Sequence, residues 1–358
     1  MVDAQLTDLY GTVVAVQANF YQVRLDSAVM GENLLCTRRA RLQKIGQSVM
    51  VGDRVRVEEA NFDDRQGAIA EVLPRSTEID RPAVANIEQI LLVFALAEPV
   101  LDPWLISRFL VKAESTGLEI AVCVNKIDLG EPEQIELWGD RLASWGYQPF
   151  FVSVEKNRGF EALLAQLNHK ITLLAGPSGV GKSSLINCLI PEINQRVGDV
   201  SGKLQKGRHT TRHVELFALP NRGLLADSPG FNQPDINCSP EQLTFYFPEV
   251  RERLALGNCQ FNDCTHRREP NCVVRGDWER YQHYLEFLEE AIAREQSLQK
   301  TSTKESSLKL KIKEAGQETY EPKLANKKYR RPSRRGKNQD QERYENKTLQ
   351  DIYNDDSE

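Results

Sequence analysis

Residues 176–183 read G-P-S-G-V-G-K-S, with an apolar run at 171–175 before them and a helix-forming run at 184–189 after them. This is the G-x-x-x-x-G-K-S pattern of a phosphate-binding loop between a strand and a helix. Glycines let the backbone wrap closely around phosphate oxygens, and amide hydrogens with the helix N-terminus supply positive potential. We expect Lys182 to reach the β- and γ-phosphates and the Ser183 hydroxyl to ligate Mg²⁺. The expected nucleotide contacts are Gly176, Pro177, Ser178, Gly179, Val180, Gly181, Lys182, Ser183 and Ser184.

A second motif addresses the base, which the phosphate loop alone leaves open between adenine and guanine. The chain reads N-K-I-D at 125–128, after an apolar strand predicted at 118–124. It resembles the N-K-x-D motif of GTPases, in which the aspartate accepts two hydrogen bonds that adenine cannot donate. Ser153, after another predicted strand, lies where GTPases carry a weak fifth guanine-contacting motif. The expected base contacts are Asn125, Lys126, Ile127, Asp128 and Ser153.

Two further segments fit the parts of a GTPase that respond to the γ-phosphate. D-S-P-G at 227–230 ends the apolar strand expected at 223–226 and matches the D-x-x-G element. Asp227 would hold Mg²⁺ through water, and the Gly230 amide would sense the γ-phosphate. Between the phosphate loop and this element lies G-R-H-T-T at 207–211, so Thr210 or Thr211 should close over Mg²⁺. The sequence favours Thr211 slightly and does not separate the two.

The region from about residue 87 alternates apolar strands with helical patterns, which predicts a parallel sheet covered on both faces. The expected strands are 87–96, 118–124, 149–154, 171–175 and 223–226, and the expected helices are 103–116, 133–145, 160–168 and 184–189. An α/β P-loop GTPase domain is therefore predicted at 82–245.

Residues 1–75 instead hold short Val-rich strands interrupted by Gly, Asn and Asp, expected at 11–25, 34–42, 53–60 and 68–73. About five short strands in this length suit a small closed barrel such as an OB-fold, and the pattern equally allows an SH3-like barrel. Pro74 and Pro82 bracket a predicted linker.

Three of the seven cysteines cluster near a histidine. Cys259-x₄-Cys264-x-His266-x₅-Cys272 supplies three sulfurs and one imidazole, which would close one tetrahedral, structural Zn²⁺ site per chain. Cys36, Cys123, Cys188 and Cys238 stand singly and are expected to be reduced and mostly buried. A helix follows the cluster, with an apolar stripe formed by Trp278, Tyr281, Leu285, Leu288 and Ile292. We expect this face to pack on its own small α-helical zinc-binding domain, at 246–297.

The last residues are rich in Lys, Glu, Ser and Gln, so we expect residues 298–358 to form a disordered basic tail. Residues 323–337, KLANKKYRRPSRRGK, contain eight basic side chains and no acidic one. Such a run is usually solvated, but beside an OB-fold it suggests contact with RNA phosphates. The overall formal charge of −5 does not by itself suggest a nucleic-acid binder.

The motifs occur in a rotated order. Ordinary GTPases place the phosphate loop first and N-K-x-D last, whereas here N-K-x-D at 125–128 comes first, followed by the phosphate loop at 176–183, the threonines at 210–211 and D-x-x-G at 227–230. On these motifs, together with R-P at 81–82 and A-N at 85–86, the chain resembles the circularly permuted, ribosome small subunit-dependent GTPase A family over about residues 9–295. The resemblance implies an OB-fold, a GTPase domain and a zinc-binding domain. It also implies GTP hydrolysis to GDP and phosphate, stimulated by the small (30S) ribosomal subunit during its late maturation.

The hydrolytic group is less evident. Ras-like GTPases carry a water-orienting glutamine after D-x-x-G, and this chain has Phe231 there, which cannot hydrogen-bond water. His209 is the best internal candidate, or it contacts rRNA or the protein surface instead. We expect slow hydrolysis alone, on the order of 10⁻⁴ to 10⁻² s⁻¹ for incomplete sites, and stimulation by a partner.

The leading interpretation is therefore an rRNA-binding GTP hydrolase with Zn²⁺, with Mg²⁺ accompanying GTP, and with GTP/GDP, the small subunit and its 16S rRNA as partners. A GTP-binding RNA scaffold with negligible hydrolysis is the alternative. A translation GTPase is disfavoured by analogy, because the known types keep the ordinary motif order. No apolar run reaches the roughly 18–20 residues that cross a bilayer, and no secretion signal is evident. We therefore expect a cytoplasmic protein without membrane contact. We also expect it to be a monomer.

Overall fold

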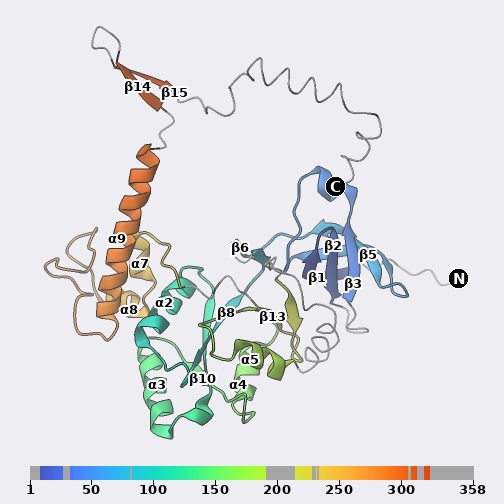
Figure 1. Ribbon diagram of the computed structural model, residues 1–358, viewed down its shortest axis with the longest axis horizontal. Helices are drawn as coiled ribbons and strands as arrows, with labels where there is room; N and C mark the ends of the chain where they lie inside the picture. Colours follow the sequence, from blue (N-terminus) through green and yellow to red (C-terminus); the bar gives the residue numbers. More distant parts are fainter. Residues whose placement is uncertain are drawn as a thin grey trace, which may run out of the picture. The chain divides into compact units, whose positions relative to one another are not determined.

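The N-terminal region is a closed barrel in the computed structural model (Figure 1). The structure describes residues 9–26, 33–80, 83–190, 214–227, 231, 234–304, 308–312 and 318–322; side chains are described up to residue 299, those of residues 43, 80 and 227 excepted. The barrel strands follow the order β1-β2-β3-β5-β4, and β1 pairs with β4 to close the ring. Their bounds are β1 Leu9–Gln17, β2 Phe20–Leu25, β3 Asn33–Arg38, β4 Arg54–Asn61 and β5 Gln66–Val72.

Two expectations for this region were wrong in detail. The run predicted as one strand at 11–25 is a hairpin, because β1 and β2 pair antiparallel around a turn where Ala18 has φ 52°. The strand predicted at 34–42 ends at Arg38, and the short helix α1 (Ala40–Lys44) follows. The closed barrel itself is confirmed, with a core of Val13, Val23, Leu34, Cys36, Val55 and Ile69.

The middle of the chain forms a six-stranded sheet in the order β10-β9-β8-β11-β13-β12. The strands are β8 Gln89–Ala95, β9 Glu119–Asn125, β10 Pro149–Phe151, β11 Ile171–Ala175, β12 Leu216–Ala218 and β13 Leu224–Asp227. All neighbours pair in parallel except β12, which runs antiparallel to β13 at the edge. The sequence did not predict β12, whose three residues are too short to give a recognisable alternation.

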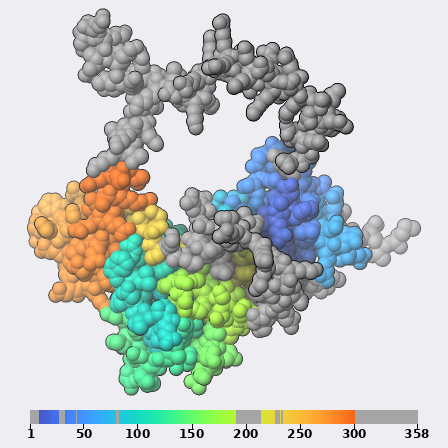
Figure 2. Space-filling view, in the orientation of Figure 1, coloured from blue at the N-terminus to red at the C-terminus, as the bar shows by residue number. Residues whose placement is uncertain are grey.

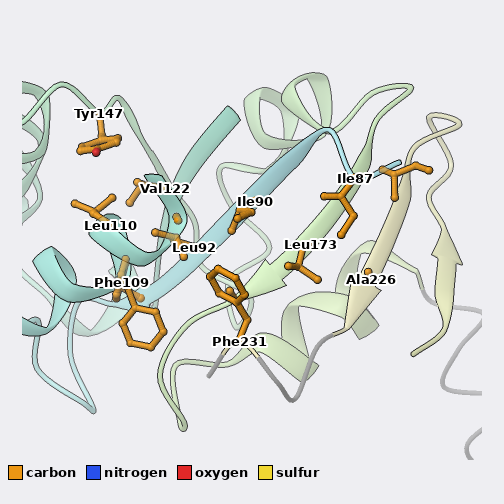
Figure 3. Packing of buried hydrophobic residues seen from close by; sticks show 14 of the residues in the cluster. Ile87, Ile90, Leu92, Phe109, Leu110, Val122, Tyr147, Leu173, Ala226 and Phe231 are labelled. Atoms are coloured by element: carbon orange, nitrogen blue, oxygen red, sulfur yellow. The ribbon is translucent and has the colours of Figure 1, made fainter. Parts of the chain in front are cut away.

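Helices cover both faces of this sheet, as predicted. They are α2 Pro103–Glu114, the 3-10 turn η1 Ile127–Leu129, α3 Pro132–Ser144, α4 Phe160–Gln166 and α5 Lys182–Leu189. Side chains of β8 alternate between the two resulting cores, so Ile90, Leu92 and Phe94 pack with α2 and α3 (Figure 3). Leu91, Val93 and Ala95 face the opposite side and pack with α4 and α5. Burial on both faces explains the continuous apolar run of β8.

The segment between the barrel and the sheet holds the two together. It contains the small hairpin of β6 (Glu78–Asp80) and β7 (Ala83–Ala85). Asn86 donates from Nδ2 to the Gly52 carbonyl at 2.9 Å and accepts from the Ser76 amide at 2.8 Å. Arg75 bonds the fully buried carboxylate of Asp53 at 2.7 Å. The barrel is therefore joined to the start of β8 by buried polar contacts as well as by the chain.

In the described residues after the sheet there are three helices, namely α7 Pro240–Phe245, α8 Pro248–Leu256 and α9 Tyr281–Lys304. The expected stripe of Trp278, Tyr281, Leu285, Leu288 and Ile292 packs with Phe247, Val250 and Val274 of the same region, which confirms that interpretation. The cluster also includes Val111 of α2, so this region packs against a helix that covers the six-stranded sheet (Figure 2).

Regular structure continues into the segment after residue 297, where a disordered tail was expected, so that expectation was wrong for 298–304, 308–312 and 318–322. The helix α9 extends to Lys304, and β14 (Leu308–Ile312) pairs antiparallel with β15 (Glu318–Pro322). The chain divides into the units 1–292 and 293–358, and the basic run at 323–337 lies outside the described residues. Among the described residues, no helix combines the length and the apolar composition that crossing a membrane would require.

Candidate nucleotide-binding site and metal centre

The loop at 176–183 connects the carboxyl end of β11 to α5, as the sequence predicts. Gly176 has φ 136° and Gly181 has φ 96°, a region that favours glycine. A Cβ at Gly176 would lie 2.1 Å from the Val93 carbonyl oxygen, so only glycine fits this close approach. Lys182 is the first residue of α5, and its Nζ donates to the carbonyls of Gly176 at 2.7 Å and Pro177 at 2.6 Å. Its ammonium group therefore lies over the loop, where phosphate oxygens would be.

The N-K-I-D segment is bonded directly to this loop. Asn125 is buried and donates from Nδ2 to the Val180 carbonyl at 3.0 Å. Lys126 has φ 59°, and its Nζ donates to the Gly179 carbonyl at 2.9 Å and to the Glu98 carbonyl. These two side chains join the end of β9 to residues of the phosphate loop that lie 55 and 53 positions further along the chain.

Ser153 joins the same cluster from the end of β10. Its side chain is fully buried, and its Oγ donates to Oδ1 of the exposed Asp128. The Asn125 Oδ1 accepts from the Val154 amide at 3.3 Å, which fixes the following loop as well. The predicted base-contacting residues therefore lie together at one edge of the sheet, with the Asp128 carboxylate held by a hydroxyl and open to solvent.

The remaining predicted residues are only partly described. Ser183 and Ser184 are exposed in the first turn of α5. Asp227 ends β13 opposite Leu174 of β11, so its backbone lies at the same edge as the phosphate loop. The residues His209, Thr210, Thr211 and Gly230 lie outside the described part of the chain.

Phe231 belongs to the core and not to the solvent face of the site. Its side chain is 3% exposed and packs among the residues that α2 covers (Figure 3). The Lys112 Nζ of α2 lies 5.0 Å from its ring centroid, a cation–π contact. Burial lowers the pKa of Lys112, and nearby Asp235 opposes that shift. The residue that replaces the usual glutamine thus anchors the chain after β13 against α2.

The four predicted metal ligands also come together. The ligand atoms of Cys259, Cys264, His266 and Cys272 all lie within 4.8 Å of one another. The Cys259 and Cys272 sulfurs are 3.8 Å apart, and His266 Nδ1 lies 3.6 and 3.3 Å from them. Bond lengths of about 2.3 Å to sulfur and 2.0 Å to nitrogen in a tetrahedron require edges of roughly 3.5–3.8 Å. The three distances among Cys259, His266 and Cys272 lie close to these values, and the four residues could hold one metal ion.

Surrounding bonds hold this loop in shape. The hydroxyl of Tyr281 donates to the His266 carbonyl at 2.8 Å, and that of Tyr284 donates to the Thr265 carbonyl at 2.9 Å. Burial opposes ionisation of Glu269, but hydrogen bonds from the Thr265 hydroxyl and from backbone amides lower its pKa to about 2. Burial also lowers the pKa of His266, which favours the neutral imidazole that binds metals. Such supporting bonds are common around metal ligands.

Sequence reasoning missed the loop between β8 and α2. The Glu98 carbonyl from this loop accepts the Lys126 bond, and Pro99 lies 3.7 Å from a Cβ built at Gly179. No side-chain motif marks a backbone carbonyl. The topological rule that ligands bind at the carboxyl ends of parallel strands was the available signal, since this loop follows the central strand β8.

Comparison with known proteins gives consistent matches. The family model described as RsgA GTPase matches residues 72–237. A Microcystis aeruginosa protein named "Small ribosomal subunit biogenesis GTPase RsgA" is 98% identical over 358 residues, all of both chains. A Synechocystis protein of the same name is 56% identical over 92% of this chain and 93% of its own length.

Two solved structures are similar over most of the chain. The circularly permuted GTPase YloQ has a TM-score of 0.68 and 30% identity, covering 82% of this chain and 98% of its own. YjeQ from Thermotoga maritima has a TM-score of 0.67 and 30% identity, covering 80% and 100%. The fold of this region is therefore the circularly permuted GTPase fold, and its strand order places the loops at 125–128, 153 and 176–183 at one edge. The chain belongs to the RsgA GTPase family and is a GTP hydrolase.

Proposed function

We propose that GTP binds at the edge of the sheet where residues 125–128, 153 and 176–184 meet, and that its hydrolysis serves biogenesis of the small ribosomal subunit. The hydrogen bonds that join these three segments are the observation that carries the site. The names of the relatives from Microcystis and Synechocystis support the role in small-subunit biogenesis.

Each segment has a distinct role in this proposal. Lys182 and the amides of the loop bind the β- and γ-phosphates, and Asp128 accepts the guanine N1 and N2 hydrogens. Ser183 and Asp227, with Thr210 or Thr211, would hold the Mg²⁺ that accompanies GTP and neutralises its phosphate charge. The Gly230 amide would sense the γ-phosphate, and His209 is the candidate for orienting water because Phe231 is buried.

The metal centre has a structural role in this proposal. Cys259, Cys264, His266 and Cys272 would bind one Zn²⁺ and leave no position open for a substrate. The helices after the sheet then form a zinc-binding domain, with the boundaries 246–297 expected from the sequence.

RNA contact is assigned to the ends of the chain. The barrel, at 1–75, is assigned to the OB-fold, which its closed five-stranded order supports. This fold and the basic run at 323–337 of the tail would contact 16S rRNA of the 30S subunit. A monomer in the cytoplasm, where ribosomal subunits mature, completes the assignment.

The test is single-turnover GTP hydrolysis by the full chain, alone and with purified small or large subunits. We expect slow cleavage alone and an increase of at least about 10³-fold with small subunits, within the range that partners provide. Equal stimulation by large subunits would contradict the proposed partner. Tight GTP binding without stimulated cleavage would favour the scaffold alternative.

A further inference from the structure

A half-enclosed cavity of about 640 Å³ lies at the amino ends of the parallel strands, the edge of the sheet opposite the nucleotide site. Its walls come from the barrel, from the linker before β8 and from the turns that precede β11 and β13. The phosphate loop follows the carboxyl end of β11, and the cavity borders Ile171 at its start. Five residues of extended strand separate the two by roughly 15 Å, so the cavity is a distinct site.

The barrel presents a row of polar side chains to this cavity. Thr12 of β1 pairs with Arg24 of β2 and with Arg54 of β4, so the three side chains share one face of adjacent strands. Arg54 donates to the Thr12 hydroxyl at 3.2 Å and to Asp26 at 2.6 Å. Arg24 has no ion pair or side-chain hydrogen bond among the described residues, although Thr12 and Asn33 are its partners on the two neighbouring strands.

The sheet contributes two turns from the other side. His169 and Arg222 both have positive φ, 57° and 66°, which is uncommon for residues other than glycine. The turns are bonded to each other because the Leu224 amide donates to the Lys170 carbonyl at 2.9 Å. Asn221 bonds the Leu164 carbonyl and accepts from the Gly223 amide at 3.2 Å, so the turn that carries Arg222 is fixed. The exposed Arg222 side chain has no ion pair in the described residues.

The charge balance of the cavity favours an anion. Four cationic side chains line it, against the two carboxylates of Asp26 and Glu88. One of the four, Lys170, is paired with Glu119 outside the lining at 2.7 Å. Asp26 is already paired with Arg54, and Glu88 accepts from the Ile171 amide at 2.9 Å. Arg24 and Arg222 therefore keep uncompensated charge on opposite walls, while Thr12, Ser76 and Asn86 add polar groups.

The lining also indicates which part of a ligand is recognised. None of the described side chains that line the cavity is a phenylalanine, tyrosine or tryptophan, so it offers no such ring for stacking a base. Arginine forks match phosphate geometry. We propose that this cavity binds phosphate groups of an RNA backbone, through Arg24 on the barrel and Arg222 on the sheet. The identification of RNA rests on the proposed function, while the excess positive charge does not.

One phosphodiester segment held by both walls would bridge the barrel and the GTPase domain. Contacts of this kind fix the position of a protein on RNA without reading its sequence. The site therefore predicts binding that depends on salt and is indifferent to base identity.

The test measures binding of a fluorescein-labelled 12-nucleotide uridine RNA to the full chain by anisotropy, at several salt concentrations. Arg24→Gln combined with Arg222→Asn removes both charges, and asparagine tolerates the positive φ at 222. We expect affinity about tenfold weaker, and a salt slope less steep by about 1.4, at roughly 0.7 for each lost contact with a single strand. Unchanged GDP affinity would verify that the variant is folded.

A charge-matched control is Arg41→Gln with Lys44→Gln, on the exposed helix α1 outside the cavity. Loss of RNA affinity in the control equal to that in the cavity variant would overturn the proposal, as would unchanged RNA binding by the cavity variant. A loss confined to binding of poly-glutamate would assign the cavity to an acidic protein and would also overturn it. In the parent, RNA should slow amide exchange at residues 168–170 and 221–223.

These results separate the cavity from the proposed function. If small subunits fail to stimulate GTP hydrolysis while the cavity variant still loses RNA affinity, the proposed role in small-subunit biogenesis is wrong and the cavity assignment stands. If stimulation is present and the variant binds RNA like the parent, only the cavity assignment fails.

Discussion

At the scale of single residues, the site depends on side chains whose burial the sequence does not reveal. Phe231 stands where a water-orienting glutamine is expected, and the structure buries it against α2. Ser153 is buried as well and holds the Asp128 carboxylate. Phe231 therefore explains why the site lacks a water-orienting glutamine, and Ser153 explains how the Asp128 carboxylate is oriented.

Restoring a glutamine at position 231 should not restore a catalytic group. The Phe231→Gln variant would bury an amide among Leu92, Leu173 and Phe109, so we expect a loss of roughly 3 kcal/mol in unfolding free energy. GTP hydrolysis by the protein alone should not increase. Urea unfolding measures the first effect, and Phe245→Gln, at a 58% exposed position, should cost less than about 0.5 kcal/mol. Faster hydrolysis at unchanged stability would show that position 231 faces the nucleotide.

Removing the Ser153 hydroxyl should weaken guanine binding. In Ser153→Ala, Asp128 loses the bond that orients it, which corresponds to about 1 kcal/mol or a five- to tenfold lower GDP affinity. Titration calorimetry with GDP and ADP measures the change, and the control Ser115→Ala alters a hydroxyl at the exposed end of α2. If GDP affinity stayed at the parental value, Ser153 would have no part in base recognition.

At the scale of elements, the sequence predicted those parts that local patterns determine. Strand β11 matches its prediction residue for residue, because an apolar run bounded by a phosphate-loop motif has clear ends. The hairpin of β1 and β2 was read as one strand because its turn, Ala18-Asn19, contains neither glycine nor proline. The helices α7 and α8 were not predicted, since their apolar residues are few and Phe247 and Val250 are buried only by tertiary packing.

The metal loop is the element whose fold depends most on a ligand. It has no helix or strand between residues 257 and 280, and four ligands bind it together. We expect Cys264→Ala to lose bound zinc, with faster amide exchange at residues 259–272 and parental GDP affinity. Metal analysis and exchange mass spectrometry measure this, and Cys188→Ala outside the cluster should retain one zinc. A full zinc complement in Cys264→Ala would remove Cys264 from the ligand set.

At the scale of the whole molecule, the helices after the sheet are bound to the nucleotide domain through polar contacts that join distant parts of the chain. Arg108 of α2 bonds Glu290 of α9 at 2.6 Å, and Trp104 donates to Glu286 at 2.8 Å. Pro234, shortly after Phe231, is bonded to the same arginine, because Arg108 also donates to the Pro234 carbonyl at 3.2 Å. Movement at the end of β13 would therefore reach α2 and α9 directly. No local pattern predicted these contacts, since they depend on the final arrangement of the elements.

The centre of this interface is a buried ion pair. Arg280 is fully buried and bonds Glu249 of α8 at 2.7 Å, and its guanidinium lies 4.9 Å from the ring centroids of Trp145 and Phe247. Trp145 belongs to the GTPase domain, so the cation is enclosed by side chains from both regions. In the sequence Arg280 looks like an ordinary polar residue before a helix, which explains why it was not singled out.

Replacing only the cation should destabilise the protein strongly. Arg280→Met leaves Glu249 buried without a partner, and such losses are about 3–5 kcal/mol of unfolding free energy. Replacing both residues, as Arg280→Met with Glu249→Leu, removes the unpaired charge and should recover most of that loss, because buried ion pairs are often no better than apolar residues of similar size. Arg251→Met, which breaks an exposed pair with Glu114, should cost about 1 kcal/mol or less. Urea unfolding of the three variants measures these losses. If Arg280→Met lost no more unfolding free energy than Arg251→Met, the Arg280–Glu249 pair would not hold the two regions together. Coupling from β13 to the metal-bearing region would then have to run through α2 and α9 alone.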